Sequence, residues 1–102
     1  MVIYNKPIRD KIPEIIKESG KKCNVKKLKD SEFLVQLEKK LVEELAEYQE
    51  SKNVEELVDM LEVIYRISEL KGITSDELEG VKNEKAKKRG KFDDNLFLVD
   101  TY

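Results

Sequence analysis

Two short acidic clusters are the residues of this chain whose types and spacing could do chemistry. The first has the pattern Glu-Glu-x-x-Glu, the second has the pattern Glu-Glu-x-x-Asp, and a polar break at residues 51–53 separates them. Residues three apart are neighbours on the surface of a helix, so each helical segment would project one pair of carboxylates. The pairs are Glu44 with Glu47, and Glu56 with Asp59. We expect them to face each other across a tight connection between antiparallel helices.

Opposed carboxylate pairs repel each other strongly unless a proton or a cation lies between them. Two carboxylates about 6 Å apart, at an effective dielectric constant of roughly 20, repel by about 3 kcal/mol. Such a site should raise a pKa or hold a cation. Because every ligand is an oxygen, the pattern favours a hard divalent ion, with Mg²⁺ or Mn²⁺ ahead of zinc.

A simpler interpretation competes for each acidic cluster taken alone. Charged residues make up 41% of the chain, and most charge runs are a solvated helix face. Glu56 also follows Asn53 by three positions and could close a capping box at the start of a helix. The opposition of both clusters across one hairpin favours the metal site over these alternatives.

Length and composition limit the class of protein before any motif does. A chain of 102 residues predicts a single domain over residues 1–102 with a modest core. A net charge of -2 gives no sign of a nucleic-acid or membrane surface, and no apolar run is long enough to span a bilayer. Cys23 is the only cysteine, which favours a reducing, cytoplasmic setting.

The chain has no histidine, and this removes the commonest general base and transition-metal ligand. Catalysis would therefore have to use carboxylates, lysine, arginine, tyrosine or a metal. That restriction agrees with the acidic clusters as the centre of any activity.

Four helices are predicted to position these clusters. A first helix includes Pro13 in its first turn and ends near Gly20. The others are expected at about 31–50 with Asp30 as the cap, at 54–71, and at 75–89 after a capping box that opens at Thr74. The fold class is therefore all-α, an antiparallel helical bundle, and the terminal segments could add short strands.

The helix at 54–71 is apolar around most of its circumference. One sector runs from Val54 through Val58 and Leu61, and a second sector beside it includes Met60 and Val63. A helix of this kind is buried on several sides, which a single chain of this size can hardly provide. We expect a homo-oligomer with this helix at the interface, and the alternative is that the terminal segments cover the surplus.

The acidic motifs resemble the signature of the all-α nucleoside triphosphate pyrophosphohydrolases, the MazG-like and phosphoribosyl-ATP pyrophosphohydrolase-like superfamily. The signature is matched by Glu43-Glu44-x-x-Glu47 together with Glu56-x-x-Asp59. Two flanking segments, 9–13 near the start and 89–92 near the end, resemble the ends of the small single-domain members. The similarity therefore extends over nearly the whole chain.

The resemblance implies Mg²⁺-dependent hydrolysis of a nucleoside triphosphate, or a related nucleotide, to the monophosphate and pyrophosphate, as in nucleotide-pool house-cleaning. It also implies a dimer or tetramer of helical subunits. The metal ligands that it implies are Glu44, Glu47, Glu56 and Asp59, with Glu43 available to a further metal or to the water. Either Glu43 or Glu47 could orient the attacking water or take its proton.

Cationic side chains should meet the departing pyrophosphate. The candidates are Lys6, Arg9, Lys11, Lys88 and Arg89. Two other classes of function stay open on the sequence: a non-catalytic helical assembly module, and a metal-dependent nucleotide sensor without turnover. No pattern of residues in the chain indicates which base or sugar the protein would prefer.

Overall fold

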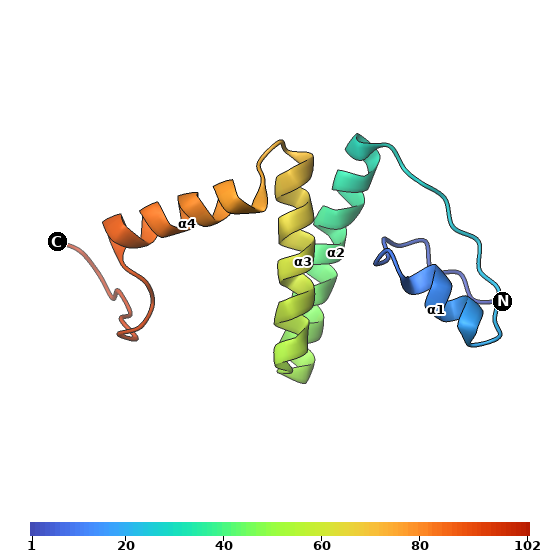
Figure 1. Ribbon diagram of the computed structural model, residues 1–102. Helices are drawn as coiled ribbons and strands as arrows, with labels where there is room; N and C mark the ends of the chain where they lie inside the picture. The colour runs from blue at the N-terminus through green and yellow to red at the C-terminus, as the bar shows by residue number, and fades with distance from the viewer.

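The computed structural model describes all 102 residues and consists of four helices without a strand (Figure 1). The helices are α1 Ile12–Glu18, α2 Asp30–Ser51, α3 Val54–Leu70 and α4 Ser75–Arg89. The all-α prediction is confirmed. Residues 1–4 and 96–99, where short terminal strands were expected, have no regular secondary structure in the single chain.

The antiparallel pair of α2 and α3 forms the centre of the molecule (Figure 1). Lys52 adopts a left-handed conformation with φ of 59°, and its amide donates to the carbonyl of Tyr48 at 2.7 Å, which ends α2. Asn53 then caps α3 by accepting from the amide of Glu55 at 2.9 Å. This connection of Lys52 and Asn53 reverses the chain direction within two residues.

The two helices bury a thin layer between them. Leu37 on α2 and Val63 on α3 are the only buried apolar residues, with 5% and 6% of their surface exposed. The predicted second sector of α3 faces this layer, because Met60 and Ile67 are half-buried there. The spacing of apolar residues predicts a stripe along α2 made of Leu34, Leu37, Leu41, Leu45 and Tyr48. Leu45 is instead 43% exposed, because α3 is the only helix packed against α2.

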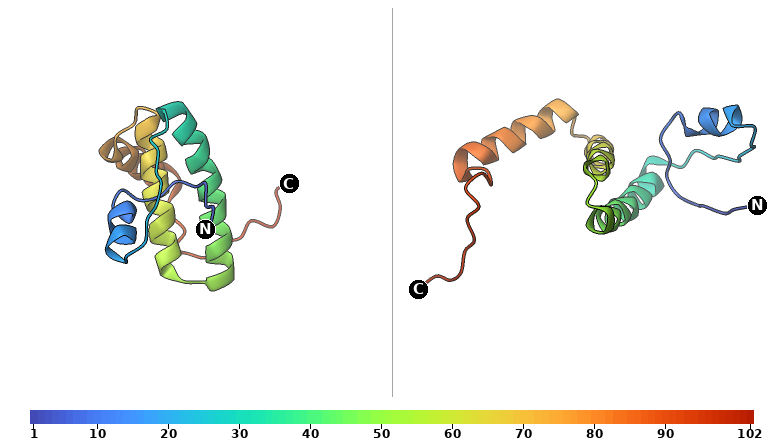
Figure 2. Two further views of the ribbon diagram at one scale, coloured as in Figure 1. Left: turned by 90° about the vertical axis from the view of Figure 1, so that its right-hand side faces the viewer. Right: turned by 90° about the horizontal axis from the view of Figure 1, so that it is seen from below.

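The remaining elements extend to opposite sides of the hairpin (Figure 2). The segment that carries α1 lies on one side, and α4 leads away on the other, where it packs only against α3. The principal extents are 60 × 32 × 24 Å and the radius of gyration is 17.8 Å, against about 13 Å for a compact chain of this length. The single chain is therefore open and elongated.

Local capping explains where α4 begins. The hydroxyl of Thr74 accepts from the amide of Glu77 at 3.1 Å, and the Glu77 carboxylate accepts from the amide of Thr74 at 3.4 Å. The predicted capping box is confirmed. At α2 the prediction was wrong in detail, because Asp30 is the first helical residue and Lys29 occupies the cap position without a side-chain bond.

None of the helices is long and apolar enough to cross a membrane.

Candidate metal centre

The α2–α3 hairpin brings three carboxylates from two helices to one place. An oxygen from each of Glu44, Glu56 and Asp59 lies within 4.8 Å of the other two. Glu56 is free to join this group because Asn53 caps α3 through Glu55, and the side chain of Glu56 makes no capping bond. The capping box considered for Glu56 is therefore not formed.

Glu44 is the most unusual member of the cluster because it is buried. Its side chain is 7% exposed, and its Oε1 forms an ion pair with Nζ of Lys40 at 3.2 Å. Its Oε2 atom is buried and has no hydrogen-bond partner. A buried polar atom without a partner costs about 1–3 kcal/mol, and more if it is charged. An ion held by the cluster is one of the few arrangements that would satisfy it.

Glu47 lies beside the cluster and responds to its charge. Repulsion by Glu44 raises the pKa of the Glu47 carboxyl above its ordinary value of 4.5, and partial desolvation and the charge of Glu56 raise it further. Glu47 remains exposed to solvent. A carboxylate that is reachable by water and holds its proton more tightly than usual is suited to accept a proton.

Arg9 connects the N-terminal segment to the same cluster. Its guanidinium donates to Oδ1 of Asp59 at 2.7 Å, across 50 positions of the chain. Both side chains are about half exposed, so the pair contributes little to stability, on the order of 1 kcal/mol or less. It does place a cation directly at the edge of the carboxylate cluster.

The other predicted site residues lie outside the carboxylate cluster. Glu43 is exposed and, together with Lys6, lines a hollow between the N-terminal segment and α2. Lys11 is exposed and makes no ion pair. Lys88 and Arg89 lie in the last turn of α4, which leads away from the hairpin (Figure 1). The single chain therefore does not bring those two cations to the carboxylates.

Lys40 is a residue of the site that the sequence reasoning did not identify. It is mostly buried, with 17% of its side chain exposed, and it neutralises one oxygen of Glu44. The signal was present, because Lys40 precedes Glu44 by one helical turn and such residues are neighbours.

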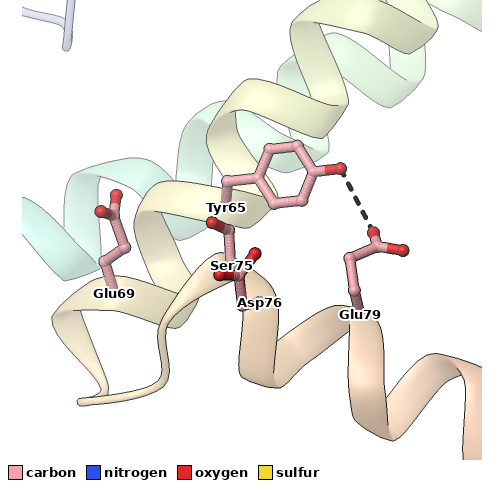
Figure 3. Close-up of a pocket in the computed structure, with 5 residues that line it drawn as sticks. All are labelled: Tyr65, Glu69, Ser75, Asp76 and Glu79. Atoms are coloured by element: carbon pink, nitrogen blue, oxygen red, sulfur yellow. Dashed lines mark hydrogen bonds between the residues drawn. The ribbon is translucent and has the colours of Figure 1, made fainter.

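A second, separate pocket lies at the junction of α3 and α4 and has a volume of about 380 Å³. Figure 3 shows the Tyr65 hydroxyl pointing at the carboxylate of Glu79, with an O–O distance of 3.4 Å. The pocket also contains Asp76 and Glu69 and has no basic side chain. It is apart from the carboxylate cluster and joins α4 to the hairpin.

Comparisons of the chain with protein-family models, with curated proteins and with solved structures gave no match.

Proposed function

We propose that this protein is a Mg²⁺-dependent nucleoside triphosphate pyrophosphohydrolase, with Mn²⁺ as a competent substitute. The observation that carries the proposal is the buried Glu44 carboxylate, which contributes an oxygen to a cluster with Glu56 and Asp59 and whose Oε2 has no hydrogen-bond partner. A purely solvated acidic surface gives no reason to bury a carboxylate in this way. The acidic motifs and their resemblance to the all-α pyrophosphohydrolases supply the reaction type.

The residues present fit a hard divalent cation. The donors are carboxylate oxygens from Glu44, Glu56 and Asp59, with Glu47 adjacent, and no nitrogen or sulfur ligand lies among them. Such a donor set suits Mg²⁺ or Mn²⁺ better than softer metals. When bound, the ion would supply positive charge against the phosphate oxygens and make a bound water more acidic.

The chain's own residues have separate tasks in this reaction. The water oxygen forms a bond to the phosphorus nearest the sugar, the bond from that phosphorus to its bridging oxygen breaks, and the electron pair leaves with pyrophosphate. Glu47, which is exposed to solvent and adjacent to the cluster, takes the proton of the water. Glu43, one position before the buried carboxylate, is the second candidate for this task.

Cations near the cluster would meet the phosphate charge. Arg9, already at Asp59, is the nearest of the predicted group, and a guanidinium can bind phosphate oxygens in pairs. Lys88 and Arg89 could reach a carboxylate cluster only from another subunit or after α4 changes its direction.

We also propose that the active form is a homo-oligomer. The chain exposes 9652 Å², against about 6,000 Å² for a compact monomer of 11.9 kDa. The excess of about 3,700 Å² exceeds what each partner buries even in most obligate dimers. It includes the first sector of α3, where Val54, Val58 and Leu61 are 69%, 50% and 48% exposed. The terminal segments do not cover that sector in the single chain, since Phe97 and Leu98 are themselves exposed.

The direct test is incubation of the pure protein with a panel of triphosphates and Mg²⁺, followed by product identification. Monophosphate with pyrophosphate is expected. Release of single phosphates would contradict the proposed position of attack, and metal-dependent nucleotide binding without turnover would favour a sensor instead. Neither binding nor turnover would favour an assembly module.

Variants connect the activity to the cluster. Glu47→Gln and Asp59→Asn should each abolish turnover while the helical circular dichroism spectrum is retained. Glu62→Gln, on the exposed face of α3, is the matched control and should retain turnover. Full activity in either of the first two variants would contradict the proposed site.

A further inference from the structure

A basic hollow lies next to the carboxylate cluster, between the N-terminal segment and α2. Its volume is about 320 Å³, and three of its lining side chains are lysines: Lys6 from the segment, and Lys39 and Lys40 from α2. Glu43 is its single acidic residue. We call this feature the lysine hollow. Because Lys40 is already paired with Glu44, the remaining excess of positive charge comes from Lys6 and Lys39 against Glu43. This excess suits a small polyanion.

Lys40 connects the lysine hollow to the metal centre. Its ammonium group is 3.2 Å from Oε1 of Glu44, and its side chain also lines the hollow, so one residue belongs to both features. Lys40 is mostly buried, which fixes its position more firmly than that of a free surface lysine. A ligand bound at the carboxylates through one phosphate could therefore extend directly into the hollow with the next ones.

The N-terminal segment that borders the hollow has a bent backbone and a cation held against an aromatic ring. Asn5 has a positive φ of 46°, which turns the backbone there. The ammonium group of Lys6 lies 5.5 Å from the centre of the Tyr4 ring, which holds that cation at the rim. Tyr4 is 68% exposed, and apart from Pro7 the rest of the lining is polar or charged. The hollow therefore does not resemble the apolar pockets that enclose a nucleobase.

We infer that the lysine hollow binds the pyrophosphate group: the two outer phosphates of the substrate and then the product that they form. The inference rests on the proposed function and assigns a direction to the substrate. The phosphorus nearest the sugar lies at the carboxylates, and the outer phosphates extend between Lys6 and the lysines of α2. Lysine ammonium groups supply compact charges that phosphate oxygens can contact from several directions.

The test measures binding of inorganic pyrophosphate by titration calorimetry, with a chelator present so that no divalent metal contributes. Lys39→Gln and Lys6→Gln should each weaken binding about tenfold or more, the effect of losing one hydrogen bond to a charged group. Both side chains are exposed, so neither substitution should disturb the fold. Lys85→Gln on α4 removes the same charge far from the hollow and should leave the affinity unchanged.

Two further results would overturn the inference. One is equal weakening in all three variants, which would show that only net charge matters. The other is pyrophosphate affinity that is the same in Lys39→Gln, Lys6→Gln and the unsubstituted protein. If that second result accompanies normal Mg²⁺-dependent turnover, the hollow is misassigned and the proposed function stands. If no triphosphate is turned over but the lysine variants lose pyrophosphate, the hollow stands and the proposed reaction fails.

Discussion

Glu44→Gln is the most informative perturbation of the proposed metal centre, because Glu44 is the buried member of the carboxylate cluster and its Oε2 has no hydrogen-bond partner. Two unit charges at the separation of these oxygens, at most 4.8 Å, repel by about 3.5 kcal/mol or more at an effective dielectric constant of about 20. Glu44 takes part in two such interactions, with Glu56 and Asp59, and it also repels Glu47. Without metal, the substitution removes these repulsions and also the ion pair with Lys40 at 3.2 Å.

The informative quantity is therefore the change in Tm on adding Mg²⁺, because that difference cancels effects on the metal-free fold. An ion present at about 100 times its Kd stabilises the folded state by about 2.7 kcal/mol. For a domain of this size that is an increase in Tm of roughly 10–20 °C. The unsubstituted protein should show this increase, and Glu44→Gln should show little or none.

The assay is thermal unfolding by circular dichroism over a Mg²⁺ titration, at fixed protein concentration and with NaCl added to hold ionic strength constant. Glu38→Gln is the control, since Glu38 is an exposed carboxylate on the same helix. It should retain the full increase. An equal increase in Tm for Glu44→Gln would refute the proposed role of the buried carboxylate.

Three more predictions concern charge, assembly and capping. Glu47→Gln should raise Tm at pH 7 without metal, but not below pH 4.5. As pH rises through 4.5, the unfolded state loses the Glu47 proton before the folded state does. The ionised Glu47 therefore destabilises the fold above that pH, and the substitution removes this effect. Val58→Glu, at a half-exposed apolar position on α3, should reduce the mass measured by light scattering from that of an oligomer towards 11.9 kDa, because it places a charge in the proposed interface. Thr74→Ala should cost about 1 kcal/mol in urea unfolding, because it removes the hydroxyl that accepts from the Glu77 amide at the start of α4.

Each of these has its own control. For Glu47, a gain in Tm that persists at pH 4 would mean that the effect is not electrostatic. Val58→Leu should keep the oligomer mass, and an unsubstituted protein that already runs at the monomer mass would contradict the assembly proposal. Thr74→Ser retains the capping hydroxyl and should retain most of the stability.

Helical periodicity and capping residues were sufficient to predict the hairpin. The short polar break, with Asn53 as the cap of the next helix, set the antiparallel arrangement, and spacing by three then placed Glu56 with Asp59. Thr74 and Glu77 fixed the start of α4 in the same local way. These features depend on interactions within one or two helical turns, so they can be predicted from residues that are close together in the sequence.

Features that depend on distant contacts could not be predicted in this way. Arg9 was expected to meet phosphate, and its contact with Asp59 joins positions 50 apart without any periodic signal. The direction of α4, which takes Arg89 away from the carboxylates, depends on the turn after α3 and on how Tyr65 meets Glu79. Leu45 was placed in the apolar stripe, but the narrow contact between only two helices leaves it exposed.

The short connection at Lys52 and Asn53 also has a consequence for the order of folding. All of the clustered carboxylates belong to one continuous stretch from Glu44 to Asp59. Closing so short a loop costs little chain entropy, and local contacts of this kind form early. A divalent ion would thus encounter a nearly complete set of oxygens before the terminal segments have packed, so Mg²⁺ should accelerate refolding of the chain more than it slows unfolding.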